Sequence, residues 1–146
     1  MKHTISEITV GYTPNKMVPN FKITCSVVAS NFIRDQWDHG TFELQEEFKV
    51  LLLNNSNEPL GIYPLSKGGM TYTGVDLRIL FGVILKSGAT AFISVHNHPS
   101  GKMKPSNADF QLHNKMKEIS ELFGINFLDN LILSKEAYYS FMEDGY

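Results

Sequence analysis

With 146 residues, of which 42% are hydrophobic and 19% charged, the chain is long enough for one compact domain with its own apolar core. Its formal net charge of -2 and its lack of any lysine and arginine block argue against a strong nonspecific surface for duplex nucleic acid. A lone cysteine, Cys25, excludes an internal disulfide and a cysteine-rich zinc site.

Residues 1–25 are predicted to form an irregular N-terminal leader that packs on the domain or extends it, because Gly11, Pro14 and Pro19 interrupt regular structure. This segment lacks the apolar core of a signal peptide, and no stretch reaches the roughly 20 apolar residues of a membrane span. We therefore expect a cytoplasmic protein whose single domain covers residues 26–146, beginning with a helix over 26–37.

The rest of the chain alternates between strand and helix patterns. Strands near 47–53 and 59–65 form a predicted hairpin, and a helix begins at its N-cap Asp76 and ends at Gly88. A buried strand over 90–95, a helix over 106–123 that stops at Gly124 and a final strand near 125–133 follow. This alternation predicts a layered α/β sheet.

The segment from Ser94 to Asp109, SVHNHPSGKMKPSNAD, contains the most informative spacing in the chain. His96 and His98 stand at the exit of the predicted strand, where residues i and i+2 point the same way with Cα atoms roughly 6.5 to 7 Å apart. Both imidazoles can therefore reach one metal ion. Pro99 and Gly101 are expected to turn the chain sharply away after the second histidine.

Ser106 and Asp109 open the following helix and lie on one helical face, so both are expected to look back toward the end of the strand. The same pair also resembles a capping box, and the two interpretations are compatible because Ser106 can cap the helix while its hydroxyl faces a ligand. Two histidines and one carboxylate make three ligands, which leaves the fourth position of a tetrahedral zinc open for water. An open position is typical of a catalytic site.

A carboxylate that takes a proton from such a water is expected elsewhere in the chain. The candidates are Glu46 and Glu47, at the start of the strand over 47–53. Alternation places Glu46 on one face with Phe48 and Val50, and Glu47 on the other face with Lys49. We expect Glu46 to be the more enclosed carboxylate and the base, with Glu47 as the alternative.

The run His96-Asn97-His98-Pro99-Ser100-Gly101, followed by Pro105-Ser106 and Asp109, resembles the JAMM motif of the JAB/MPN metallopeptidases, and specifically their RadC-like bacterial branch. Further similarities over 75–81, 128–132 and 139–141, together with Glu46, extend the resemblance to about residues 41–146. The resemblance implies a cytidine-deaminase-like fold, a three-layer α/β/α sandwich with a mixed sheet.

The same resemblance implies zinc held by His96, His98 and Asp109, Glu46 as general base and Ser106 as an aid to the tetrahedral oxyanion. Characterised JAMM enzymes cleave peptide or isopeptide bonds, often beside a ubiquitin-like C-terminus, so a peptide or protein substrate is implied. Two features depart from the RadC pattern. Asn130 stands where a histidine is usual, and no counterpart of the helix-hairpin-helix DNA-binding segment precedes the domain.

Two other functions compete with a zinc peptidase. One is a DNA-associated repair factor or nuclease, as the RadC name suggests, although the net charge does not favour it. The other is a partner-binding scaffold, against which the intact ligand set argues. Lys102 and Lys104 are either solvated or recognise an acidic substrate. His113, one turn after Asp109, is interpreted as ordinary helix surface or packing rather than as support for the metal.

Overall fold

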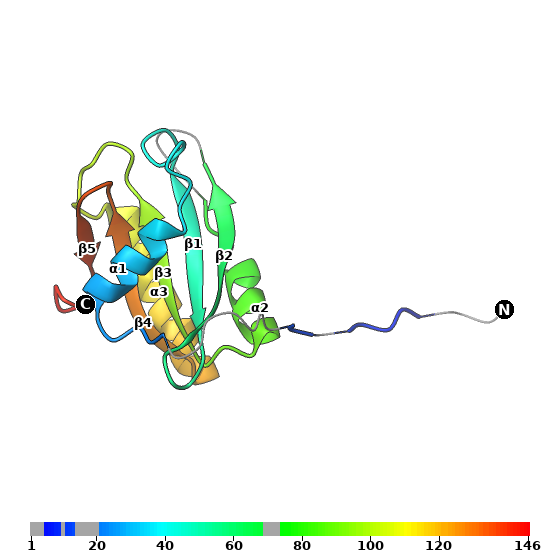
Figure 1. The fold of residues 1–146 in the computed structure, drawn as a ribbon. Helices are drawn as coiled ribbons and strands as arrows, with labels where there is room; N and C mark the ends of the chain where they lie inside the picture. The colour runs from blue at the N-terminus through cyan, green and yellow to red at the C-terminus, as the bar shows by residue number, and fades with distance from the viewer. Residues whose placement is uncertain (1–4, 10, 14–20, 69–73) are drawn as a thin grey trace.

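A computed structural model describes residues 5–9, 11–13, 21–68 and 74–146 of the chain. The helices and strands of this part are α1 (Ser26–Asp35), β1 (Glu47–Leu53), β2 (Pro59–Lys67), α2 (Leu77–Ser87), β3 (Ala91–Asn97), α3 (Asn107–Phe123), β4 (Asn126–Leu133) and β5 (Tyr138–Ser140) (Figure 1). The helix predicted over 26–37 thus ends two residues early. The strand predicted over 90–95 continues through His96 and Asn97.

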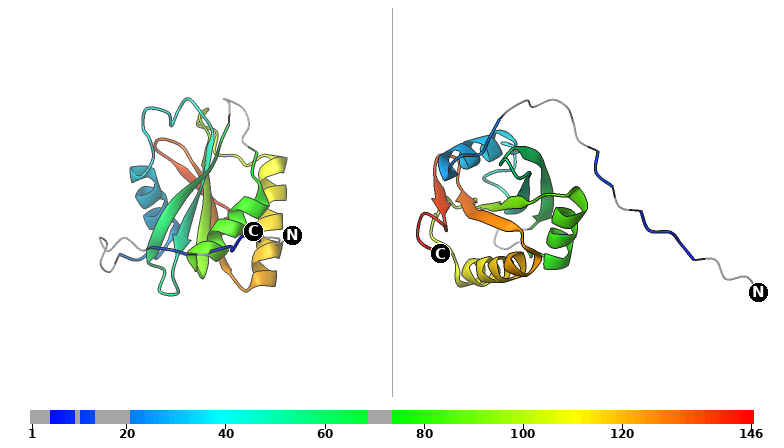
Figure 2. Two further views of the ribbon diagram at one scale, coloured as in Figure 1. Left: turned by 90° about the vertical axis from the view of Figure 1, so that its right-hand side faces the viewer. Right: turned by 90° about the horizontal axis from the view of Figure 1, so that it is seen from below.

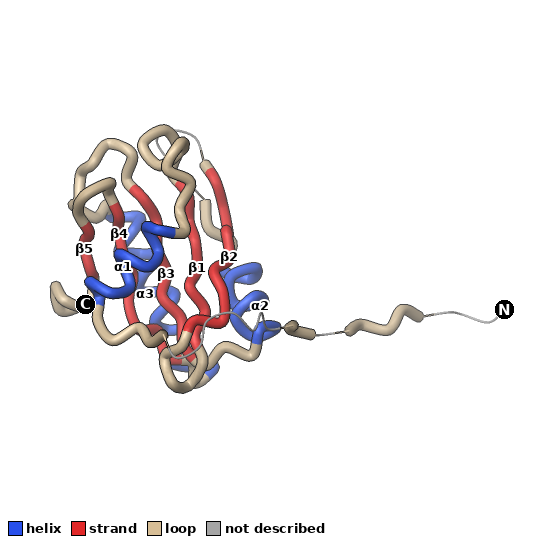
Figure 3. The backbone as a smooth tube through the Cα atoms, viewed as in Figure 1, coloured by secondary structure: helices blue, strands red, loops and turns tan. Residues whose placement is uncertain are grey.

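The five strands form one sheet in the order β2-β1-β3-β4-β5. Strands β3 and β4 are parallel and the other neighbours are antiparallel, so the sheet is mixed, as predicted. Helix α1 covers one face, and α2 and α3 cover the other (Figures 2 and 3). The predicted three-layer α/β/α sandwich is confirmed.

Strands β1 and β3 are buried along their whole length because helices cover both faces of the sheet. Successive side chains point to opposite faces, so Leu51 and Val95 pack in the cluster against α1, whereas Phe48 and Val50 pack in the cluster against α2 and α3. Phe48 is the register partner of His96. His96, near the end of β3, therefore faces the layer formed by α2 and α3.

The predicted helix boundaries at α2 and α3 follow from local capping. The Asp76 carboxylate accepts a hydrogen bond from the backbone N–H of Arg78 at 2.8 Å, which satisfies one of the free donors at the start of α2. Gly88 and Gly124 end α2 and α3 with φ angles of 70° and 65°, a left-handed conformation that glycine adopts without steric cost.

Two features of the ends of the chain differ from the prediction or add to it. The strand near 125–133 is not the last, because β5 pairs antiparallel with β4; three residues are too few to show a strand period.

The described parts of the N-terminal leader, residues 5–9 and 11–13, have no regular structure, and the Tyr12 hydroxyl donates to the carbonyl of Leu60 at 3.1 Å. The rest of the leader's first twenty residues lies outside the described residues. Within the described part, no helix is long and apolar enough to cross a membrane.

His113 is a packing residue, in agreement with one of the two roles predicted for it. Its side chain is 1% exposed and stacks on Phe141, with ring centroids 4.6 Å apart, and neither ring nitrogen has a hydrogen-bond partner among the described residues. Burial, together with the charge of Lys117, lowers the pKa of His113 below its ordinary value.

This buried imidazole predicts a pH-dependent stability. The unfolded chain takes up a proton at His113 near pH 6.5 whereas the folded chain takes it up only at a lower pH, so the free energy of unfolding should fall as the pH drops below about 6.5. Urea unfolding between pH 7.5 and 5 measures this loss. His113→Leu should lose less stability over that range than the parent, and the surface control His39→Leu should follow the parent. Equal slopes for His113→Leu and the parent would refute the assignment.

Candidate metal centre

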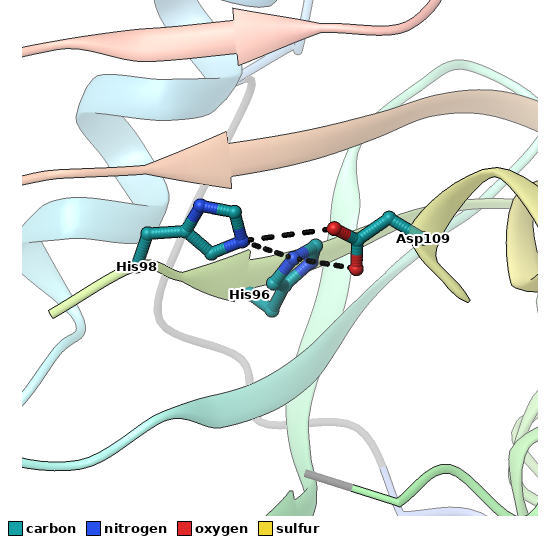
Figure 4. Close-up of side chains that lie close together, drawn as sticks. All are labelled: His96, His98 and Asp109. Atoms are coloured by element: carbon teal, nitrogen blue, oxygen red, sulfur yellow. Dashed lines mark hydrogen bonds and ion pairs between the residues drawn. The ribbon is translucent and has the colours of Figure 1, made fainter. Parts of the chain in front are cut away.

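The end of β3 presents two imidazoles on one face. His96 is 3% exposed and stacks on Phe48 of β1, with ring centroids 6.0 Å apart. The backbone N–H of His98 donates to the carbonyl of Leu133 at 2.9 Å, which keeps the chain close to extended beyond the last residue of β3. The Nε2 atoms of the two histidines lie 3.1 Å apart (Figure 4). The predicted i, i+2 arrangement is present.

Asp109 reaches the two histidines from the first turn of α3 (Figure 4). Its Oδ2 accepts hydrogen bonds from the backbone N–H of Ser106 at 2.7 Å and from the Ser106 hydroxyl at 2.8 Å, while its own N–H donates to Ser106 Oγ at 3.1 Å. This is a complete capping box. Asp109 Oδ1 lies 3.2 Å from His96 Nε2, so one carboxylate both caps the helix and faces the imidazoles.

These three side chains lie close enough together to hold one metal ion. Ligand atoms about 2.0–2.1 Å from such an ion lie about 3.3 Å from one another. The observed separations are 3.1 Å between the two Nε2 atoms, 3.2 Å from His96 Nε2 to Asp109 Oδ1 and 3.8 Å from His98 Nε2 to Asp109 Oδ2. The last two distances involve different oxygens of Asp109, and one ligand atom from each of the three residues lies within 4.8 Å of the other two. Three protein ligands leave the fourth corner of the tetrahedron open.

The loop after β3 orients the His98 ring for metal binding. Gly101, with a φ of 75°, lies in the predicted turn, and its N–H donates to the carbonyl of His98 at 2.9 Å. His98 Nδ1 is within hydrogen-bond distance of the carbonyl of Lys102. Because a carbonyl only accepts, Nδ1 must carry the proton, and Nε2 of the neutral ring is left with a lone pair for a cation.

The charge state of Asp109 also suits a cation. Burial alone would raise the pKa of its carboxyl group, but the hydrogen bond and charge of His96, together with the hydrogen bonds from Ser106, hold that pKa well below its ordinary value. Asp109 is therefore ionised at neutral pH. An ionised carboxylate is the form that binds a metal.

A cleft of about 560 Å³ opens beside these ligands. His98, Ser106 and Asp109 line it, and Glu46 lines the same cleft from the start of β1. His96 lies beneath, in the buried layer. The structure therefore brings all five sequence-predicted site residues to one region, with Glu46 and Ser106 lining the same cleft as His98 and Asp109.

The side chain of Glu47 points to the face of the sheet opposite Glu46. The expectation that Glu46 is the more enclosed of the two carboxylates is wrong. Glu47, and not Glu46, is the more enclosed carboxylate: it is buried, whereas Glu46 is partly exposed in the cleft. Glu47 pairs with Lys49 at 3.7 Å and Lys67 at 3.4 Å and accepts from the Thr41 hydroxyl at 3.1 Å. These ion pairs on the α1 side explain its burial. Strand alternation alone predicts that Glu47 lies on this face.

Asn97, between the two histidines, is the site residue that the sequence argument missed. Its side chain faces the α1 side, is fully buried and donates to the carbonyls of Phe42 at 2.6 Å and Gln45 at 2.8 Å. Its Oδ1 accepts from the backbone N–H of Glu47 at 2.7 Å. These bonds fix the chain on both sides of Glu46. Strand alternation could have identified Asn97 from the sequence. A residue between two histidines of one face points to the opposite face, and a buried amide there needs hydrogen-bond partners.

The sequence model of one family, described as the RadC-like JAB domain, matches residues 23–146. The chain belongs to the RadC-like JAB domain family. The match confirms the resemblance drawn from the motif and extends it toward the N-terminus, where it includes α1. A JAB domain suggests a metal-dependent hydrolase, and the His96, His98 and Asp109 cluster is a metal site compatible with that chemistry.

Relatives of this RadC-like chain are named UPF0758 proteins. The one from Flavobacterium johnsoniae is 48% identical over 100 residues, which are 68% of this chain and 44% of that protein. The relative from Porphyromonas gingivalis is 39% identical over 102 residues, 69% of this chain and 45% of its own length. That from Syntrophotalea carbinolica is 36% identical over 142 residues, 97% of this chain and 61% of its own length. The chain spans about half the length of these relatives.

The departure from the RadC pattern at Asn130 lies inside the sheet. Asn130 is buried on β4, and its Oδ1 accepts from the Ser94 hydroxyl of β3 at 2.9 Å. Ser94 precedes His96 by two residues and shares its face. In this member of the RadC-like JAB domain family, the side chain of Asn130 therefore links the parallel strands β3 and β4 next to the proposed metal ligands.

Proposed function

We propose that the chain is a zinc-dependent hydrolase of peptide or isopeptide bonds. Its substrate is a peptide or a protein, and a ubiquitin-like protein is one candidate. The observation that carries the proposal is that His96, His98 and Asp109 each bring one ligand atom within 4.8 Å of the other two, beside a cleft that Glu46 also lines. The family match supports the hydrolase class. The preference for zinc rests on the donor set, since two imidazoles and one carboxylate with an open fourth position suit catalytic zinc.

In this proposal His96, His98 and Asp109 hold the ion, which when bound supplies Lewis-acid chemistry and lowers the pKa of a coordinated water toward about 7. Glu46 takes one proton as the oxygen of water attacks the carbonyl carbon of the substrate. The amide C–N bond then breaks, and Glu46 returns that proton to the leaving nitrogen. The elements of water are thereby added across the bond, and Glu46 ends in its starting state.

Ser106 is assigned to the oxyanion that forms on the substrate carbonyl. Its hydroxyl now donates to Asp109 Oδ2, and its backbone N–H donates to the same oxygen. If the hydroxyl turns toward the cleft, the backbone bond still holds the carboxylate. The capping function and the catalytic function can therefore coexist in one residue.

Asn97 is assigned to positioning, because it anchors the segment that carries Glu46 to the strand that carries the histidines. Asn97→Ala would remove the side-chain partner of two buried backbone groups and one half-buried one, and should lower the free energy of unfolding by about 3 kcal/mol. At a temperature where the variant is folded, kcat should fall while zinc affinity stays close to that of the parent. Calorimetric zinc titration and kinetics separate the two effects.

The matched control is Asn54→Ala at the far end of β1. Asn54 also makes three hydrogen bonds, to Ser56 and Glu58, but these close the β1–β2 turn. Its loss should reduce stability without changing kcat. An Asn97→Ala variant whose kcat equals that of the Asn54→Ala variant would remove the positioning role and leave Asn97 a purely structural residue.

The experiment that tests the proposed function compares zinc-stripped and zinc-reconstituted protein on a peptide library that includes isopeptide-linked members. We expect cleavage only with zinc, at one zinc per chain, and its restoration when zinc is returned to stripped protein. Cleavage that persists in stripped protein would refute the zinc-dependent mechanism. A zinc-loaded protein that cleaves no library member would refute the peptidase assignment and favour the competing DNA-associated function.

A further inference from the structure

Three lysines surround the cleft beside the proposed metal site. Lys102 and Lys104 come from the loop between β3 and α3, and Lys115 comes from α3, where it lies one turn after Gln111 on the cleft side. All three side chains are exposed. None of them forms an ion pair with a carboxylate in the described part of the chain, although Lys49, Lys67 and Lys135 do.

The balance of charge makes this cleft unlike the rest of the molecule. The chain as a whole carries a formal charge of -2. The cleft is lined by three lysines and two carboxylates, those of Glu46 and Asp109, so its lining has one net positive charge before any cation is bound. A divalent metal makes it more positive. A cleft with a net positive charge attracts ligands of the opposite charge.

Lys102 has a fixed relation to the site. The carbonyl of Lys102 is the partner of His98 Nδ1, so the backbone that carries Lys102 is tied to a proposed metal ligand. Val75, Leu77 and Leu112 contribute apolar surface to the same cleft. The cleft therefore offers cationic groups and apolar contacts next to the three ligand atoms, which suits a polypeptide with acidic and apolar groups near the bond to be cut.

We infer that this cleft selects peptide segments with carboxylates close to the scissile bond, recognised by Lys102, Lys104 and Lys115. The inference rests on the proposed function and names its substrate class. The carboxylates come either from acidic side chains or from a free C-terminus. A peptide is favoured over nucleic acid because the overall charge is negative and the sequence has no basic block that would follow a phosphate backbone beyond the cleft.

The test measures binding by fluorescence anisotropy of zinc-loaded protein to labelled peptides of equal length, one rich in Asp and Glu and one with Asn and Gln at the same positions. Each peptide is made with a free and an amidated C-terminus, which separates the two sources of carboxylate. We expect carboxylate-bearing peptides to bind at least about tenfold more tightly at low salt, with the difference shrinking as salt is added.

The variant for this test is the triple change Lys102→Gln, Lys104→Gln and Lys115→Gln. It should abolish the preference for carboxylates and keep one zinc per chain. The matched control changes three exposed lysines away from the cleft, Lys22→Gln, Lys86→Gln and Lys117→Gln, with the same loss of charge. The control should retain the preference.

The outcomes separate this inference from the proposed function. An equal affinity for acidic and amide peptides, or a triple variant that keeps the preference, overturns the inference while zinc binding and cleavage stand. Tighter binding of a single-stranded or duplex DNA oligonucleotide, dependent on the same three lysines, also overturns it and assigns the cleft to nucleic acid. Failure to bind zinc overturns the proposed function itself, and metal content measured on every sample detects that failure directly.

Discussion

Replacement of Glu46 by glutamine is expected to lower the rate of peptide hydrolysis by about 10² to 10⁴-fold, the usual contribution of a positioned general base. Glutamine has nearly the shape of glutamate but cannot take up the proton. Glu46 is not one of the three converging ligands, so the variant should still bind one zinc ion with the affinity of the parent. Single-turnover kinetics and zinc titration on the same preparation measure both quantities.

Two other glutamates show whether the effect is specific. Glu121→Gln changes an exposed residue of α3 outside the cleft and should leave hydrolysis unchanged. Glu47→Gln should reduce stability, because it removes the charge that Lys49 and Lys67 face, and should leave the proton transfer intact. A Glu46→Gln variant that hydrolyses as fast as the parent would show that the base is another group.

Replacement of His98 by glutamine is expected to weaken zinc binding by more than about a hundredfold, since loss of a supporting partner alone costs 10 to 100-fold and this change removes a ligand. The residue is partly exposed, with 15% of its side chain accessible, so the fold should tolerate the change. Hydrolysis should disappear with the metal. Calorimetric titration of the apoprotein with zinc measures the loss directly.

The exposed His39, on the segment before β1, provides the control for this variant. His39→Gln removes one imidazole that lies outside the metal cluster and should leave both zinc affinity and hydrolysis unchanged. A His98→Gln variant that bound zinc as tightly as the parent would show that His98 is not a ligand. The proposed set of three ligands would then be wrong.

The predictions that succeeded depend on local signals. Asp76 and Gly88 mark the ends of α2 because capping involves only neighbouring backbone groups. His96 and His98 meet because alternation in a strand is a local rule, and Ser106 with Asp109 begins α3 through a capping box written in four residues. Asp109 completes that box although its side chain is shorter than the glutamate or glutamine that is usual at this position.

The predictions that failed depend on partners distant in sequence. Alternation placed Glu46 and Glu47 on opposite faces correctly, but their relative burial depends on what covers each face. Glu47 is enclosed by Thr41, Lys49 and Lys67, the last of which arrives from β2. Strand β5 is three residues long and is defined by its pairing with β4, not by a pattern of its own.

We expect His96, His98 and Asp109 to bind one zinc ion together, and every step of the proposed mechanism depends on that ion. The most direct measurement is a crystal structure of zinc-reconstituted protein with an anomalous difference map recorded at the zinc absorption edge. We predict one strong peak about 2.0–2.1 Å from both Nε2 atoms and about 2.0–2.2 Å from an Asp109 carboxylate oxygen. A map with no peak at this point, or with zinc bound elsewhere in the molecule, would contradict the claim.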